Sequence, residues 1–249
     1  MSTTTADFLL AFADDEHLMG QHHTEWIGVA PFLEEDLAFS SIGQDELGHA
    51  VALYELVLSL DDTEATDEAV DQLAFGRGAS EYRSCHLAEY PTTDWAEALV
   101  RHWIYDRFEF DRWRLVTDST LTPLRDVAVR AEREEVFHRR HADALIQPLL
   151  ASPSARARLH EALAAVLPMV PSLLAPCPGE SAAVADGVAS ASTVTLAEPL
   201  GAAIAERFDV GQPVFDLASL APRTERSEHF APMMSRMREV LDLDLHAQW

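Results

Sequence analysis

Helical periodicity of apolar residues dominates the first 150 residues of this 249-residue chain. Apolar side chains recur three or four positions apart over long stretches, and short segments with Gly or Pro separate these stretches. No stretch of useful length alternates apolar and polar residues as a half-buried strand does. The sequence therefore predicts an all-α fold. The long helices are expected up to Trp26, over 32–60, over 94–119 and from the turn at 120–123 to Leu150.

The remaining segments give weaker signals. We expect acidic residues 61–69 to be a solvated connection that starts a further helix continuing to about Tyr90. Beyond residue 150, the sequence predicts a helix over 154–167, a loop over 176–199, and short helices over 198–208 and 222–243. The expected organisation is a four-helix core with one extra connecting helix over 1–150, and a helical extension over 151–249 packed on the same domain.

Composition excludes several classes of partner. The chain has 42 Asp and Glu against 18 basic residues, all of them Arg, and a net charge of -24. Nucleic-acid binding and a polybasic membrane patch are therefore not expected. The two cysteines, Cys85 and Cys177, form neither a disulfide framework nor a thiolate zinc site. The N-terminus lacks a basic region, and no apolar run reaches about 18 residues. We expect a soluble, cytoplasmic protein.

Two Glu-x-x-His motifs carry the candidate chemistry. Glu46 and His49 lie on the second predicted helix, and Glu135 and His138 lie on the last of the four long helices. At a spacing of three residues, both side chains leave one helix face and can share a metal ion. One such motif alone is weak, because acids and histidines are frequent in this chain. In a four-helix di-iron site, however, the other two helices each add a single carboxylate.

Turn positions predict these two further carboxylates. The first turn centres near residue 30, and Glu16 and Glu46 lie at similar distances before and after it. The second turn centres near residue 121, and Asp106 and Glu135 flank it in the same way. Each helical hairpin would then place one carboxylate level with one Glu-x-x-His, to within about one helical turn of 5.4 Å. Glu109, one turn beyond Asp106, is the alternative.

The predicted ligand set contains four carboxylates and two imidazoles. Its members are Glu16, Glu46, His49, Asp106, Glu135 and His138. This set suits two iron ions, or manganese, better than zinc, which favours thiolate or imidazole ligands. Among the six, Glu46 and Glu135 are predicted to be the catalytic carboxylates. No Gly-rich nucleotide motif accompanies the set, so no other cofactor-binding residues are predicted.

Residues beside the ligand set allow two interpretations each. Asp45 and Glu134 each precede the Glu of a Glu-x-x-His motif, and would either orient ligand imidazoles or be solvated acids. Glu16 is flanked by Asp14, Asp15 and His17, so an error of one position in the count on the first helix would select one of its neighbours. His22 and His23 are close to the turn, and are expected at the surface or at an interface rather than beside Glu46.

Two stretches resemble a known family. LAFADDEHLMGQHHTEWIGVAPFLEEDLAFSSIGQDELGHA (10–50) is similar to the start of the smaller ferritin-like subunit of phenylacetyl-CoA epoxidase, including the turn from Glu25 to Glu34. RSEHFAPMMSRMREVLDLDLHAQW (226–249) is similar to the closing helix of that subunit. The resemblance implies a ferritin-like fold with additional C-terminal helices. It also implies a role in phenylacetate catabolism, within a complex that uses di-iron oxygen chemistry.

The resemblance leaves the role of the chain open. The smaller subunit of that family usually supports a catalytic paralogue and has lost most metal ligands, whereas positions 16, 46, 49 and 135 here carry Glu, Glu, His and Glu. We expect a di-iron monooxygenase component that acts on an aromatic acyl-CoA. It would associate with a paralogous ferritin-like chain or with itself, and with a separate reductase. The alternatives are a non-catalytic structural subunit and a ferroxidase or iron-storage protein.

Overall fold

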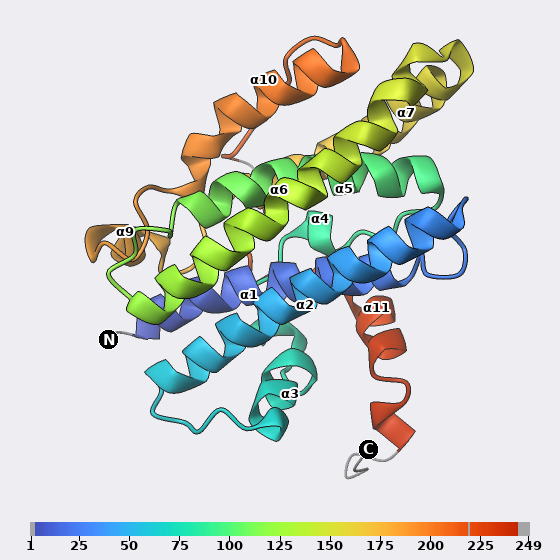
Figure 1. Cartoon of the computed structure of the whole chain (residues 1–249). Coiled ribbons are helices and arrows are strands. Elements are labelled where there is room, and N and C mark those ends of the chain that lie inside the picture. Colours follow the sequence, from blue (N-terminus) through green and yellow to red (C-terminus); the bar gives the residue numbers. More distant parts are fainter. Residues whose placement is uncertain (1–2, 219, 244–249) are drawn as a thin grey trace.

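Every regular element in the described part of the chain is helical. The computed structural model describes residues 3–218 and 220–243. Four long helices form the centre of the molecule (Figure 1): α1 (Thr3–Thr24), α2 (Leu33–Leu60), α5 (Trp95–Arg114) and α6 (Thr122–Ala151). The expected all-α, ferritin-like fold is confirmed.

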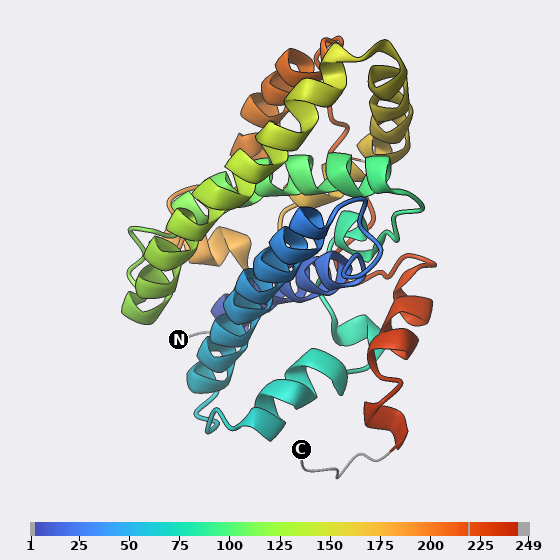
Figure 2. The same cartoon turned by 45° about the vertical axis from the view of Figure 1, so that its right-hand side comes forward.

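The four helices form two antiparallel hairpins. Helix α1 packs along α2, α5 packs along α6, and α2 contacts α6 across the hairpins (Figures 1 and 2). In the first turn, Gly28 adopts a φ of 83°, and the N–H groups of Gly28 and Ala30 donate to the Asp36 carboxylate at 3.0 and 3.1 Å. Asp94 caps the start of α5 by accepting from the N–H of Glu97 at 3.0 Å. These local contacts fix where the long helices begin.

Shorter helices surround the hairpins. They are α3 (Asp67–Phe75), α4 (His86–Glu89), α7 (Pro153–Val166), α8 (Val170–Leu174), α9 (Glu180–Ala185), α10 (Ala197–Phe208) and α11 (Phe230–Met237). Short 3-10 turns occur at Ala79–Glu81, Leu167–Met169, Thr193–Leu196 and Leu241–Leu243. Helix α7 packs on α5 and α6, and α9 packs on α1.

The expectation that the helix after the acidic connection continues to about Tyr90 is wrong. Helix α3 ends at Phe75, and the chain stays largely irregular until α4. The backbone of this segment binds buried acids instead of itself: the N–H of Arg83 donates to Asp14 at 2.6 Å, and that of Cys85 to Asp15 at 2.7 Å. Contacts with α1 therefore override the local helical pattern.

Two expectations for the C-terminal part also need correction. The segment 176–199, expected as a loop, contains α9 and the 3-10 turn Thr193–Leu196, because the buried Glu180 carboxylate accepts from Ser192 and Thr193. The helix expected over 222–243 is shorter, and comprises α11 and the turn after it. The terminal Gln248 and Trp249 of the family-like stretch lie outside the described residues.

Two hydrophobic cores stabilise the bundle. The first, here called the Trp103 core, lies mainly between α5, α7, α8, α10 and α11, and includes Trp103, Cys85 and Phe208. The second, the Trp113 core, lies between α1, α2, the start of α6 and α9, and includes Trp113 and Cys177. Within the described residues, no helix combines the length and apolar character needed to cross a membrane.

Candidate metal centre

All seven candidate ligands are buried where the two hairpins meet. Their side chains come from all four long helices, and none is more than 1% exposed. They are Glu16 on α1, Glu46 and His49 on α2, Asp106 and Glu109 on α5, and Glu135 and His138 on α6.

Six of these side chains form two groups. In one group, Glu16, His49 and Glu109 each bring one ligand atom within 4.8 Å of the others, and His49 Nδ1 lies 3.2 Å from Glu16 Oε2. In the other group, Glu46, Glu135 and His138 meet the same distance, and His138 Nδ1 lies 3.0 Å from Glu135 Oε1. Each group draws its members from more than one helix, so the bundle itself creates both groups.

Asp106 belongs to neither group. Its Oδ1 lies 3.1 Å from Nδ1 of His102, one helical turn earlier on α5. Glu109, the alternative to Asp106, takes the place in the first group. Turn length does not explain this difference, because the connections 25–32 and 115–121 differ by one residue, so the choice between the two carboxylates depends on how the hairpins pack. The geometry therefore favours Glu109, and the ligand set remains a prediction.

The flanks of Glu16 turn away from the two groups. Asp14 accepts a hydrogen bond from the Tyr54 hydroxyl at 2.8 Å and pairs with Arg77. Asp15 pairs with Arg112 and Arg223 at 2.9 and 2.8 Å. Among the three consecutive acids of α1, Glu16 is thus the one that faces the groups.

Electrostatics of the groups call for a cation. Burial raises the pKa of the Glu46 carboxyl well above its ordinary value, and the carboxylates of Glu109 and Glu16 raise it further. Burial likewise raises the pKa of Glu16 to about 7 and that of Glu135 to about 8. Both carboxylate oxygens of Glu46, Glu135 and Asp106, and Nδ1 of His138, make no hydrogen bond of good geometry, although His138 Nδ1 lies 3.0 Å from Glu135 Oε1. Bound cations would compensate the charge and satisfy these atoms, so the residues fit a two-metal centre.

Of the two interpretations of Asp45 and Glu134, the structure favours contact with the imidazoles. Glu134 Oε2 lies 2.8 Å from Nε2 of His49, and Asp45 Oδ2 lies 3.2 Å from Nε2 of His138. Each imidazole is therefore held by a carboxylate of the opposite hairpin, while its Nδ1 faces the groups. Such contacts fix the ring orientation of a metal-ligating histidine.

Comparison of the sequence with known proteins identifies a family. The sequence matches the family described as phenylacetic acid catabolic protein over residues 1–249. The chain belongs to this family. A relative, one of the subunits of the 1,2-phenylacetyl-CoA epoxidase of Escherichia coli (strain K12), is 28% identical over 149 residues. The matched stretch covers 60% of this chain and 58% of the length of that relative.

In this member of the phenylacetic acid catabolic protein family, aromatic residues that the sequence pattern did not reveal support the groups. The Tyr105 hydroxyl donates to Glu16 at 3.4 Å, and Trp113 Nε1 donates to Glu109 at 3.2 Å. The Trp113 ring also packs against His49, with centroids 5.2 Å apart. Trp113 follows Glu109 by four residues on α5, a spacing that places both on one helix face.

A row of histidines beside the second group also escaped prediction. His23 Nε2 lies 3.2 Å from His102 Nδ1, and His102 Nε2 lies 3.2 Å from His141 Nδ1. At one end, His23 Nδ1 lies 3.8 Å from Glu46. At the other end, His141 Nε2 lies 2.9 Å from Glu35.

The expectation of surface positions for His22 and His23 is therefore wrong, since both are buried. Helix α1 continues almost to the turn, so these rings face the bundle.

Proposed function

We propose that this protein binds two iron ions, or manganese, between its hairpins. The ligands would be Glu16, Glu46, His49, Glu109, Glu135 and His138. The observation that carries the proposal is the pair of buried carboxylate–imidazole groups, in which both oxygens of Glu46 and of Glu135 have no hydrogen-bond partner. Four carboxylates would balance the charge of two divalent cations, and this donor set suits iron or manganese.

The residues around the proposed ions position the ligands and keep bulk water out. When bound, the two ions would supply activation of O₂ and transfer of an oxygen atom to a substrate. Glu46 and Glu135, the proposed catalytic carboxylates, have both oxygens available for coordination. Tyr105 and Trp113 hold Glu16 and Glu109 by hydrogen bonds. Burial of the whole set excludes bulk water from the ions.

We further propose the role of a di-iron oxygenase component of the phenylacetyl-CoA epoxidase type. The family match and the name of the relative support this assignment. The substrate would be an aromatic acyl-CoA, and a separate reductase would supply electrons to the cytoplasmic complex. The family match and the relative favour oxygen chemistry over iron storage.

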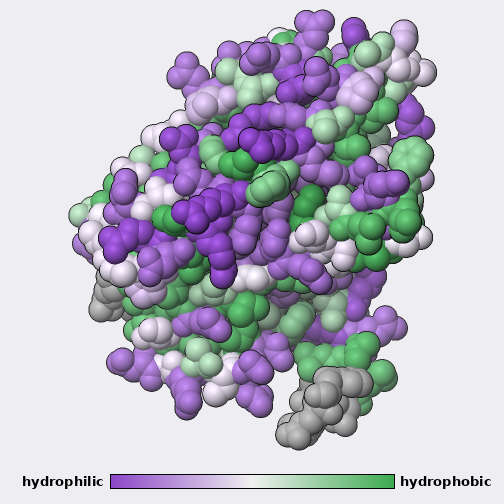
Figure 3. Space-filling model, viewed as in Figure 1, coloured by the Kyte–Doolittle hydropathy of each residue, from purple (hydrophilic) through white to green (hydrophobic). Residues whose placement is uncertain are grey.

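A paralogous ferritin-like chain is the proposed partner subunit. Hydrophobic side chains gather over the turn between α1 and α2 on the face shown in Figure 3. Phe32, Leu33 and Leu37 there are 68%, 69% and 64% exposed. Phe32 also lines an apolar pocket of about 410 Å³ with Trp95 and Leu145. An exposed apolar patch of this kind is typical of a protein interface.

A structural role is the second candidate. The relative is one subunit of a named epoxidase, and the resemblance described under Sequence analysis implies that such a chain can support a catalytic paralogue. In that case the chain would dock on the paralogue without functional metal.

Metal analysis after anaerobic loading with iron(II) tests the proposal. We expect two irons per chain in the wild type, as in other two-metal bundles. The Glu46→Ala and Glu109→Ala variants should hold fewer ions because each loses a ligand. The Asp106→Ala variant should keep both, which would decide between the two carboxylates of α5. Glu55→Ala, on the exposed face of α2, is the control.

The catalytic claim needs a second measurement. Oxygen consumption with phenylacetyl-CoA, a cognate reductase and the partner chain should fall strongly in the Glu135→Ala variant. A wild-type chain that stays metal-free would rule out the di-iron proposal and favour the structural role. Undiminished turnover of the Glu135→Ala variant would assign catalysis to the partner.

A further inference from the structure

One buried carboxylate next to Glu16 joins four parts of the chain. Asp15 is fully buried on α1. Its Oδ2 accepts from Nη1 of Arg112 on α5 at 2.9 Å and from Nη1 of Arg223 at 2.8 Å. Its Oδ1 accepts from the backbone N–H of Cys85, the cap of α4, at 2.7 Å. The Asp15 carboxylate therefore links α1, α5, the start of α4 and the segment 220–229 before α11, here called the C-terminal segment.

The pair Asp15–Arg112 lies beside two ligands of one metal group. Asp15 directly precedes Glu16 on α1, and Arg112 follows Glu109 by three residues, or one helical turn, on α5. Helices α1 and α5 pack mainly against α2 and α6, respectively, rather than against each other. A buried ion pair between α1 and α5 thus sets their separation at the place where Glu16 and Glu109 approach one another.

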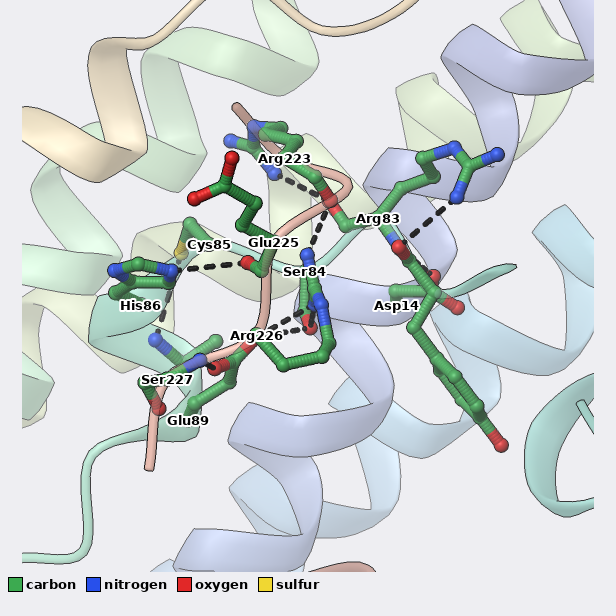
Figure 4. Close-up of polar contacts among 12 residues, drawn as sticks. Asp14, Arg83, Ser84, Cys85, His86, Glu89, Arg223, Glu225, Arg226 and Ser227 are labelled. Carbon is green, nitrogen blue, oxygen red and sulfur yellow. Dashed lines mark hydrogen bonds and ion pairs between the residues drawn. The ribbon is translucent and has the colours of Figure 1, made fainter. Parts of the chain in front are cut away.

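Arg223 ties this pair to the C-terminal segment. Its side chain is buried, and it also donates to the backbone carbonyls of Arg83 and Leu173 at 3.1 and 3.3 Å. Figure 4 shows Arg223 and Arg226 extending from this segment beside Arg83 and Glu89. Arg223 is therefore held in place by two other segments while it contacts Asp15.

Arg226 makes a second attachment that does not reach the metal groups. Its Nη1 lies 2.6 Å from Glu89 Oε1, and the N–H of Ser227 donates to the same carboxylate at 2.7 Å. The two arginines thus attach one segment to the same region, but only Arg223 contacts the residue that precedes a ligand. This difference separates a role at the metal group from a general role in folding.

We infer that Asp15 and Arg223 are positioning residues for the metal group of Glu16, His49 and Glu109. The C-terminal segment holds Asp15 against Arg112, and so holds Glu16 and Glu109 facing the same ion. The inference rests on the proposed metal centre. The group of Glu46, Glu135 and His138 lacks such a contact with Asp15 or Arg223 among the described residues.

Manganese(II) loading of the full chain tests this role. The wild type should bind two ions and give the electron paramagnetic resonance signal of an exchange-coupled pair. Arg223→Met should hold one ion, with the signal of isolated manganese, because only one group loses its positioning. Arg223→Lys should recover the coupled signal, since an ammonium group can still pair with Asp15. A variant that was merely less stable would keep the coupled signal whenever it is folded.

Arg226→Met is the matched control, and should keep two coupled ions. The inference is overturned if Arg223→Met also keeps two coupled ions, or if Arg226→Met loses one to the same degree. Should Arg223→Met not fold, the nearly isosteric Asp15→Asn provides the same test, with one ion expected and two contradicting the inference. A wild type without manganese would instead refute the proposed metal centre itself.

Discussion

Each imidazole of the two proposed metal groups contacts a carboxylate from the other hairpin. Glu134, on α6, accepts from His49, and Asp45, on α2, accepts from His138. Because these contacts cross between hairpins, they orient the rings and also fix the register of α2 against α6. At the residue scale, the proposed metal centre therefore depends on these two carboxylates as well as on its ligands.

Replacing Glu134 should weaken metal binding without removing a ligand. In Glu134→Gln, the contact with His49 loses its charge, and we expect affinity to fall about 10- to 100-fold. A competition titration against a chelating dye measures this change. Glu132→Gln is the control, because Glu132 lies on the same helix at similar exposure and pairs with Arg114 instead. Equal affinities for the two variants would contradict an orienting role for Glu134.

His22 should make the protein sensitive to mild acid. Burial lowers the pKa of its imidazole to about 4, and the Arg101 guanidinium lowers it too, despite the carboxylate of Glu25. The unfolded chain, with an ordinary histidine pKa of about 6.5, takes up the proton first as pH falls. The contribution of His22 is thus complete above about pH 6.5, and is lost progressively as pH falls towards 4.

Urea unfolding at pH 7.5 and at pH 5 measures this effect. We expect the wild type to lose more unfolding free energy between these pH values than His22→Asn, which cannot titrate there. An identical loss in both proteins would show that His22 does not contribute.

At the scale of elements, two glycines set the distance between α1 and α2. A Cβ added to Gly20 would lie 2.9 Å from Cγ of Leu47 and 3.1 Å from Cβ of Glu46. A Cβ added to Gly43 would lie 3.1 Å from the carbonyl oxygen of Gly20. A larger residue at either position would push the helices apart at the level of Glu46, a proposed ligand.

Alanine substitutions at Gly20 and at Gly48 should change the free energy of unfolding in opposite directions. We expect Gly20→Ala to destabilise the fold by about 1–3 kcal/mol through overpacking. Gly48→Ala should stabilise it by about 0.5–1 kcal/mol, because Gly48 is exposed within α2 and a Cβ there meets nothing within 4 Å. Urea unfolding measures both. A neutral Gly20→Ala would indicate that the hairpin can open at this point.

Local sequence patterns predicted the four long helices, but not the irregular segments between the shorter helices or the contacts that join the elements. The long helices and the two Glu-x-x-His motifs followed from spacing, since ligands on one helix obey helical periodicity. Glu109 was an alternative rather than the first choice, because the packing of the hairpins, and not spacing along α5, decides which carboxylate lies near Glu16 and His49. His23, Tyr105 and Arg223 had no local signal, since their partners lie on other helices and, for Arg223, 208 residues away from Asp15.

At the scale of the whole molecule, the metal groups lie between the two hydrophobic cores. On α1, Phe12 belongs to the Trp113 core and Leu18 to the Trp103 core, and Glu16 lies between them. On α5, Phe108 and Trp113 divide in the same way around Glu109. Acids that are costly to bury are thus placed where both cores shield them. The stability of each core is therefore linked to the geometry of the groups.

The two cores each contain one cysteine, so the chain carries its own reporters of local opening. Cys85 and Cys177 are free and buried, and burial raises the pKa of the Cys85 thiol to about 12. A thiol-reactive dye should modify neither in the closed protein, because it needs an accessible thiolate. Modification rates, followed by mass spectrometry of the two peptides, would then time the opening of each core.

Equal modification rates of Cys85 and Cys177 would mean that the two cores open together. Unequal rates would identify the core that opens more readily. Immediate labelling of Cys85 in the native protein would contradict its burial.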